Sequence, residues 1–209
     1  MNILIFGASG ATGHELVKQA LEQGHRVTAF VRTPIKLKVE HQHLSIFPGD
    51  VTNSSAVQEA IKGKEAVLSA LGASSPFKYD QAVVDGMANI VKAMEKENVR
   101  RLIYMSAINV KESRKDAGLL IRVLAPILLR TENAGHEARE NIIRQTNLEW
   151  TIVRAAGLTN GGHKGIYRSG EDVRSKGILS NISRKDVADF MLKQLADKKF
   201  VHKTPKIMY

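Results

Sequence analysis

Three glycines near the start of the chain have the spacing of a phosphate-binding turn. Gly7, Gly10 and Gly13 follow the apolar run 3–6 and lead into a helix-like stretch over 14–21. Glycine allows a sharp turn at Gly7, close approach of a pyrophosphate at Gly10, and close packing of the helix on the sheet at Gly13. Amides at the start of the helix would then face the phosphates. The pattern predicts a dinucleotide site, with an ordinary strand-to-helix turn as the alternative.

The residue after the second apolar run indicates which dinucleotide is bound. A site for NAD usually has an Asp or Glu about 20 residues past the glycine turn, whereas an Arg accommodates the 2′-phosphate of NADP. Arg32 occupies that position, followed by Thr33 with a hydroxyl and Lys36 with a further charge. We therefore expect NADPH to be preferred over NADH, with an exposed surface arginine as the alternative.

Further candidate contacts follow the later apolar runs. Asp50 can accept a hydrogen bond from the adenine amino group while Val51 packs on the ring, and Asp50 can also form a local turn. Leu71 and Gly72 suit a backbone that passes under the cofactor ribose, or an ordinary loop. Ser106 would lie at the nicotinamide end, or only make a hydrogen bond at the end of its strand.

These residues must be positioned by alternating strands and helices. The apolar runs predict strands, and the amphipathic stretches between them predict helices, with Ser183 as a helix N-cap. The predicted strands are 3–6, 27–31, 44–47, 66–70, 102–105 and 150–153, and the predicted helices are 14–21, 81–96, 137–145 and 183–195. This order predicts a single-domain Rossmann fold over 1–209, an α/β doubly wound parallel sheet with helices on both faces. We expect 161–177, with five glycines, to be a loop or lid.

Composition excludes several classes of site. The 209 residues include no cysteine, which rules out disulfides, thiol catalysis and cysteine-ligated metals, and we expect no metal site. The apolar stretch 117–129 is shorter than the ~20 residues of a membrane helix, so we expect no membrane association and a cytoplasmic protein. The net charge of +10 is concentrated at 100–130. Few aromatic residues and no nucleic-acid motif accompany it, which favours a basic rim over nucleic-acid binding.

Taken together, these residues resemble the atypical short-chain dehydrogenase/reductase proteins. The likeness is to the NAD(P)H-binding group that includes NmrA-like proteins and flavin reductase (biliverdin reductase B), and it extends through 89–94 and 182–188. It implies that Arg32 binds the 2′-phosphate, that Asp50 and Val51 hold the adenine, and that Ser106 lies at the nicotinamide. The residues implied for the diphosphate are Gly7, Ser9, Gly10, Ala11, Thr12 and Gly13.

Two departures limit what the resemblance implies about activity. None of the four tyrosines has a lysine four positions on, so the Tyr-x-x-x-Lys route to alcohol or sugar redox chemistry is disfavoured. Beyond the sixth predicted strand, Ala155 completes the cofactor candidates, and Gly157 stands where flavin reductase has a histidine. His136 matches another histidine of that enzyme by its distance from this strand, or is a surface or packing residue.

Two functions are therefore open. The first is an NADPH-dependent reductase of a planar conjugated acceptor such as a flavin, quinone or biliverdin-like molecule, in which Ser106 positions the nicotinamide and solvent supplies the proton. The second is an NmrA-like NADP(H) sensor without turnover that reports to a protein partner. We expect substrate-side elements around 107–135 and 155–180. Within the first, 118–129 covers a hydrophobic substrate or forms a subunit contact, as in a homodimer.

Overall fold

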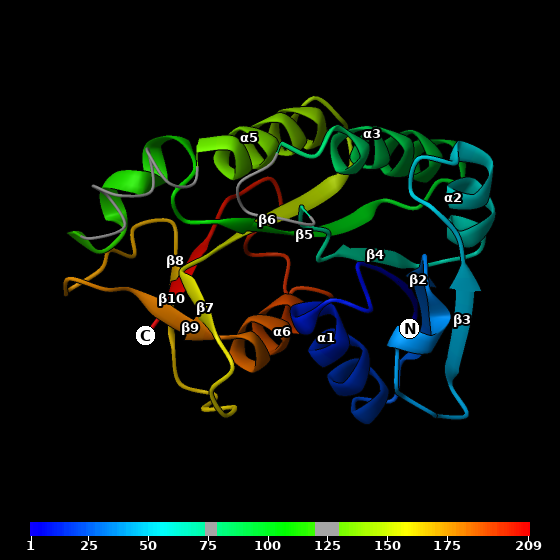
Figure 1. Cartoon of the computed structure of the whole chain (residues 1–209), viewed down its shortest axis with the longest axis horizontal. Helices are drawn as coiled ribbons and strands as arrows, with labels where there is room; N and C mark the ends of the chain where they lie inside the picture. Colours follow the sequence, from blue (N-terminus) through cyan, green and yellow to red (C-terminus); the bar gives the residue numbers. More distant parts are fainter. Residues whose placement is uncertain (74–78, 120–129) are drawn as a thin grey trace.

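The central element of the protein is a mostly parallel sheet, shown in Figure 1. This computed structural model describes residues 1–73, 79–119 and 130–209. The strands of the sheet are β1 (Asn2–Phe6), β2 (Arg26–Val31), β3 (Leu44–Pro48), β4 (Ala66–Ser69), β5 (Arg101–Ala107), β6 (Glu149–Ala155), β8 (Arg168–Gly170) and β10 (Lys206–Met208). Their spatial order is β3-β2-β1-β4-β5-β6-β10-β8, and only β8 runs antiparallel to its neighbour. A separate pair consists of β7 (Gly157–Thr159) and β9 (Asn181–Ser183).

Helices cover both faces of the sheet (Figure 1). One face carries α1 (Ala11–Glu22) and α6 (Arg184–Lys193). The other carries α2 (Ser54–Ile61), α3 (Gln81–Lys96) and α5 (Arg130–Arg144). Two short 3-10 helices, η1 (Pro34–Lys36) and η2 (Lys111–Asp116), follow β2 and β5. The expected doubly wound Rossmann architecture is confirmed. Of the helices in the described ranges, none has the length and apolar character needed to cross a membrane.

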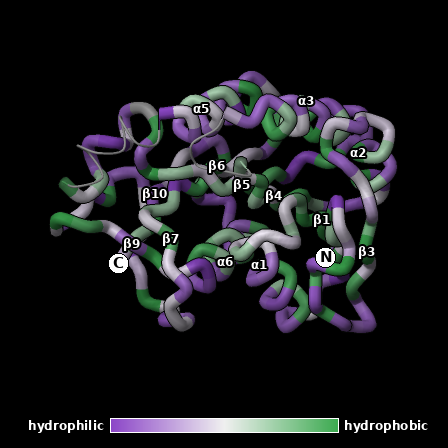
Figure 2. The backbone as a smooth tube through the Cα atoms, in the orientation of Figure 1, coloured by the Kyte–Doolittle hydropathy of each residue, from purple (hydrophilic) through white to green (hydrophobic). Residues whose placement is uncertain are grey.

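The core consists of two apolar layers separated by the sheet. Along β1, Ile3 and Ile5 pack on the α1 and α6 side, whereas Leu4 and Phe6 pack on the α2 and α3 side. This alternation follows from the two-residue period of a strand, and it explains why a strand covered on both faces is apolar throughout. Figure 2 shows hydrophobic segments between the layers and hydrophilic residues on the outer helix surfaces.

The structure extends one predicted helix. The pattern predicted a helix over 137–145, but α5 begins at Arg130. Its first two turns bury polar side chains against the sheet, so no apolar stripe marks them in the sequence. The buried polar residues of α5 are Asn133, His136, Arg139 and Glu140.

The predicted loop over 161–177 is wrong at its centre, where β8 pairs with β10. The strands β7, β8, β9 and β10 are three residues each, too short for an alternating pattern to be recognised. β10 and β8 extend the main sheet beyond β6, and β7 and β9 form the separate pair, in the region where the sequence placed one of the two substrate-side elements.

Candidate cofactor site

The glycine turn between β1 and α1 is held by close backbone contacts. Gly7 has φ +74°, and a Cβ at this residue would lie 2.7 Å from the carbonyl oxygen of Ala70. A Cβ on Gly13 would lie 2.0 Å from the carbonyl oxygen of Gly7. Both positions therefore require glycine. At Gly10, the N-cap of α1, no side chain caps the helix, so its first amides are free to bind phosphate oxygens.

A pocket of about 190 Å³ adjoins this turn at the carboxyl ends of β1, β2, β3 and β4. We call it the cofactor pocket, because this is where a Rossmann sheet binds a dinucleotide. The turn, the absence of Cβ atoms and the uncapped helix fit a diphosphate. Eight residues predicted as cofactor contacts line it: Gly7, Ser9, Gly10, Arg32, Asp50, Val51, Leu71 and Gly72.

The cofactor pocket places opposite charges near each other after β2 and β3. The exposed Arg32 follows β2, and Asp50 follows β3. The Asp50 carboxylate accepts hydrogen bonds from the backbone N–H of Thr52 at 2.9 Å and from its hydroxyl at 2.7 Å. These bonds, with a smaller contribution from Arg32, lower the pKa of Asp50. Asp50 therefore forms the local turn and still presents a charged carboxylate to the pocket.

The other predicted contacts lie outside this pocket. Thr12 and Gly13 are buried in the first turn of α1, whereas Ala11 and Thr33 are exposed. Ser106 and Ala155, at the ends of β5 and β6, are both buried. The register pairs Ser106 with Arg154 and Ala107 with Ala155, so these strand ends are adjacent. Their contact with the nicotinamide remains a prediction.

Ser106 belongs to a buried ionic cluster that the sequence analysis did not identify. Its hydroxyl donates to Glu140 Oε1 at 2.7 Å. Arg154 binds the same carboxylate with two nitrogens, at 3.1 and 2.7 Å, and donates to Glu112 at 2.8 Å. Burial by itself would raise the pKa of Glu140, but the Arg154 hydrogen bonds and charge outweigh it and lower that pKa. Glu140 is therefore ionised at neutral pH, and the Ser106 hydroxyl uses its proton in the hydrogen bond to this carboxylate.

A second buried chain runs from β5 to the start of α5. The Tyr104 hydroxyl lies 2.8 Å from His136 Nδ1, and His136 Nε2 lies 3.2 Å from Glu132. Burial lowers the pKa of His136, so the imidazole is neutral. Burial also raises the pKa of Tyr104, so the phenol donates to Nδ1 and the remaining ring proton faces Glu132. His136 is thus a hydrogen-bonded packing residue, and the surface alternative is wrong.

Arg139 connects α5 to the cofactor pocket. Its side chain is 2% exposed and donates to the carbonyl oxygen of Leu71 at 3.1 Å. This α5 side chain thus holds the backbone that lines the pocket after β4. The polar residues Glu132, His136 and Glu140 recur every four positions, which places them on one helix face, and this spacing was the signal available in the sequence.

The two expected substrate-side elements meet beside the β5 end. The backbone N–H of Ser175 donates to the Asp116 carbonyl at 2.8 Å, and that of Gly118 donates to the Ser180 hydroxyl at 3.2 Å. The predicted specificity segment 118–129 lies outside the described residues from 120 onward.

Comparison with known proteins agrees with this geometry. Residues 7–198 match the model of a family described as NAD(P)H-binding. The uncharacterized protein YwnB of Bacillus subtilis is 32% identical over 202 residues, covering 93% of this chain and 92% of that protein. Photosystem II assembly factor Ycf39 of a Synechocystis strain is 23% identical over 206 residues, covering 92% of this chain, which spans 58% of its length.

Two solved structures share the whole fold. A short-chain dehydrogenase/reductase of Veillonella parvula, solved in complex with NADP, has a TM-score of 0.82 at 22% identity and covers 99% of this chain and 93% of its own. ChuY of Escherichia coli O157:H7, described as an anaerobillin reductase, has a TM-score of 0.78 at 18% identity, covering 99% and 96%. Because the family model covers nearly the whole chain and supports the resemblance to atypical short-chain dehydrogenase/reductase proteins, the chain belongs to the NAD(P)H-binding family.

Proposed function

We propose that this protein is an NADPH-dependent reductase of a planar conjugated acceptor such as a flavin, quinone or biliverdin-like molecule. Arg32 supports the choice of NADPH, because it follows β2 and lines the cofactor pocket where an acidic residue would select NADH. The reductase fold neighbour ChuY is consistent with an acceptor of this type.

The observation that carries the choice of acceptor is the state of three of the four tyrosine hydroxyls. Tyr104 is bonded to a histidine, and Tyr167 and Tyr209 each donate to an aspartate. The pKa of each of these three phenols is raised, and burial is the largest cause. Each of them therefore holds its proton more tightly than a free phenol does. An acceptor that takes hydride into a conjugated system and a proton from solvent needs no such group.

In this proposal the chain orients two flat rings. The nicotinamide of NADPH, when bound, supplies the hydride. The amides of the glycine turn hold the diphosphate, Arg32 holds the 2′-phosphate, and Asp50 and Val51 hold the adenine. Ser106, whose proton is committed to Glu140, keeps its oxygen lone pairs as an acceptor for the carboxamide of the nicotinamide.

The experiment is NADPH oxidation by the purified protein, offered FMN, riboflavin, a quinone or biliverdin in turn. We expect at least one member of the panel to be reduced, with NADPH preferred over NADH. Tight NADPH binding without oxidation by any member would contradict the proposal.

That negative result would favour a second function, an NADP(H) sensor that reports to a protein partner. The commitment of Ser106 to Glu140 and of the tyrosine hydroxyls to their own partners supports it, because these groups have structural bonds. Its test is a pull-down with protein loaded with NADP+ or NADPH. A partner retained in only one of the two states would identify the sensor.

A further inference from the structure

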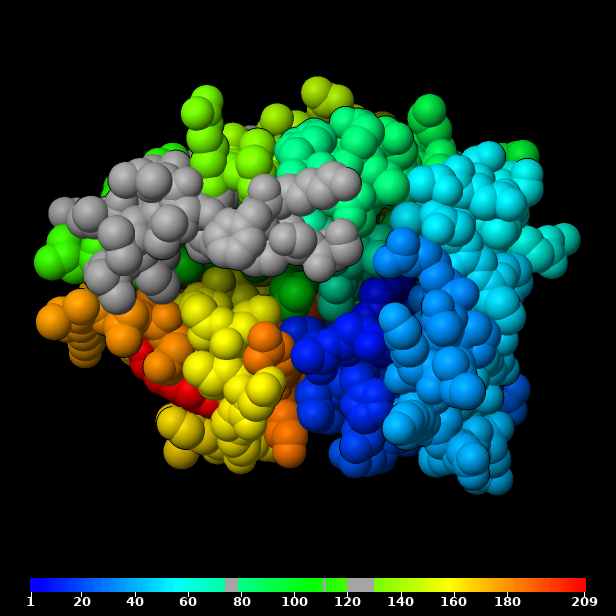
Figure 3. Space-filling model, in the orientation of Figure 1, coloured from blue at the N-terminus to red at the C-terminus, as the bar shows by residue number. Residues whose placement is uncertain are grey.

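A second hollow adjoins the glycine turn, and we call it the α1–α6 groove. Its volume is about 510 Å³, and it lies between the start of α1, Asn160 after β7, and Arg184 and Lys185 at the start of α6. It shares Ser9 and Gly10 with the cofactor pocket, so ligands in the two sites would be neighbours. In Figure 3, the blue surface of the first residues faces the yellow and orange surface of β7 and β9 across a hollow.

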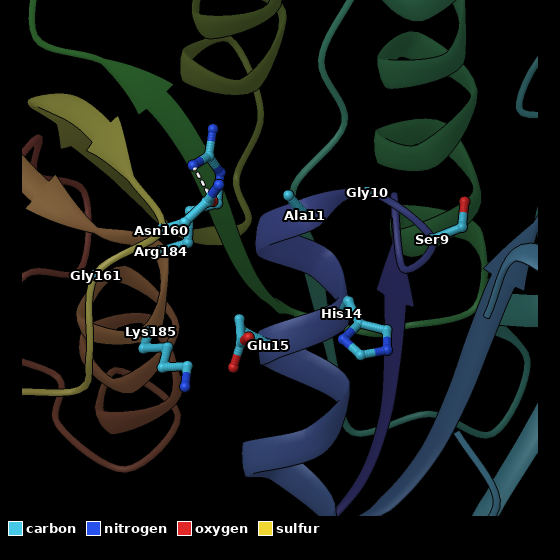
Figure 4. A pocket seen from close by; sticks show the side chains of 9 residues that line it. All are labelled: Ser9, Gly10, Ala11, His14, Glu15, Asn160, Gly161, Arg184 and Lys185. Atoms are coloured by element: carbon cyan, nitrogen blue, oxygen red, sulfur yellow. Dashed lines mark hydrogen bonds between the residues drawn. The ribbon is translucent and has the colours of Figure 1, made fainter. Parts of the chain in front are cut away.

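The lining of the α1–α6 groove has more basic than acidic side chains. Lys185 and Glu15 carry opposite charges and extend toward each other from α6 and α1 (Figure 4). His14, the residue before Glu15 on α1, belongs to the same lining. Arg184 donates to the side-chain oxygen of Asn160 at 2.7 Å, and this amide is neutral. Within the described ranges, Arg184 forms no ion pair with a carboxylate, so its positive charge is uncompensated.

The N–H donors of Arg184 that are not bonded to Asn160 suit the binding of an anion. A guanidinium carries five N–H donors in a planar fork, and the bond to Asn160 uses one nitrogen. The remaining N–H groups can bind a phosphate or carboxylate with two parallel hydrogen bonds. Because the Asn160 oxygen faces Arg184, the NH₂ group of this amide remains a further donor. The amides of α1 are assigned to the cofactor diphosphate and are not needed here.

We infer that the α1–α6 groove binds an anionic group, a phosphate or carboxylate, carried by the acceptor, with Arg184 as its counter-ion. This inference rests on the proposed function and narrows the acceptor to a planar conjugated molecule with an acidic side chain. The net charge of +10 attracts such a molecule to the protein before it binds.

The test uses two pairs of acceptors that share a ring system and differ in charge. FMN and riboflavin share a ring system and differ by a phosphate, and biliverdin and its dimethyl ester differ by two carboxylates. In Arg184→Gln we expect kcat/KM to fall about tenfold for the anionic member of at least one pair. The neutral member and the affinity for NADPH remain unchanged. The pair that responds identifies the anion.

Two further variants distinguish the loss of this anion site from other causes of a lower kcat/KM. Lys62→Gln removes one exposed charge after α2, on the opposite face, and should leave both pairs unchanged. Arg184→Lys keeps the charge without the planar fork and should give an intermediate loss. Equal changes for anionic and neutral acceptors, no change for either pair, or weakened NADPH binding in Arg184→Gln would overturn the inference.

Failure of the proposed function is distinguishable from failure of the groove. If the wild type reduces no acceptor, the binding of flavin to the NADP+-loaded protein is measured instead, by the quenching of flavin fluorescence. We then expect FMN to bind more tightly than riboflavin, and Arg184→Gln to lose this difference. Equal binding of FMN and riboflavin to the wild type would refute the groove as an anion site for phosphate-bearing acceptors.

Discussion

Replacing Arg32 with Gln tests the assignment of the cofactor most directly. Arg32 lines the cofactor pocket, and its guanidinium contributes to the low pKa of Asp50. The substitution removes the cation that is proposed to bind the 2′-phosphate of NADPH and leaves the Asp50 carboxylate in the same pocket without it. We therefore expect weaker binding of NADPH and unchanged binding of NADH, which has no phosphate at this position.

The magnitude follows from the exposure of Arg32. A hydrogen bond to a charged group contributes about 1.5–3 kcal/mol, and solvent screening at an exposed side chain reduces this to about 1–2 kcal/mol. The dissociation constant of NADPH should then rise about fivefold to thirtyfold, while that of NADH changes by less than about twofold. The difference should shrink as salt is added, because an exposed charge pair is screened.

The assay is titration of each reduced cofactor by its fluorescence, at low and high salt. The matched control is Arg26→Gln, an exposed arginine at the opposite end of β2 that should leave both affinities unchanged. Equal losses for NADPH and NADH, or no loss for either, would refute the role of Arg32 in recognising the 2′-phosphate.

Three further predictions concern the scaffold of the site. Gly13→Ala places a Cβ 2.0 Å from a carbonyl oxygen of the turn, so we expect about 1–3 kcal/mol lower unfolding free energy and loss of NADPH binding by calorimetry. Glu140→Gln leaves the buried Arg154 without its anion and should cost about 3–5 kcal/mol in urea unfolding at neutral pH. Because the folded-state pKa of Glu140 is lowered, its stabilisation is present at neutral pH and lost as the pH falls through that pKa, and this variant should lose that part of the acid dependence. Arg139→Met frees the Leu71 carbonyl and should weaken NADPH binding about threefold to tenfold, and unchanged affinity in a folded variant would contradict the positioning role.

The parts of the protein that local rules determine were predictable from the sequence. The α3 helix has the predicted bounds, 81–96, because its buried residues recur at regular helical spacing. The contacts at Gly7 and Gly13 follow from the sterics of a strand that turns directly into a helix. The residues after β2, β3 and β4 line one pocket because parallel strands place their carboxyl ends at the same edge.

The parts that depend on partners distant in the chain were not predictable. The Arg139 bond to Leu71 joins residues 68 positions apart, and the pairing of Arg154 with Glu140 requires the packing of α5 on β6. Such buried polar contacts suppress the apolar stripe that reveals a helix, which is why the start of α5 was missed. The short strands β7 to β10 are defined by their neighbours more than by their own composition.

The contacts around Asp116 and Gly118 have a consequence for protein engineering. A Cβ on Gly118 would lie 2.4 Å from the carbonyl oxygen of Ile178, and the Asp116 carboxylate binds Lys206 at 2.6 Å and Arg174 at 3.2 Å. The segment after β5 and the segment before β9 therefore fit each other as one interlocking unit. A loop transplanted from a relative into either segment alone would meet a mismatched partner, so the two segments should be exchanged together.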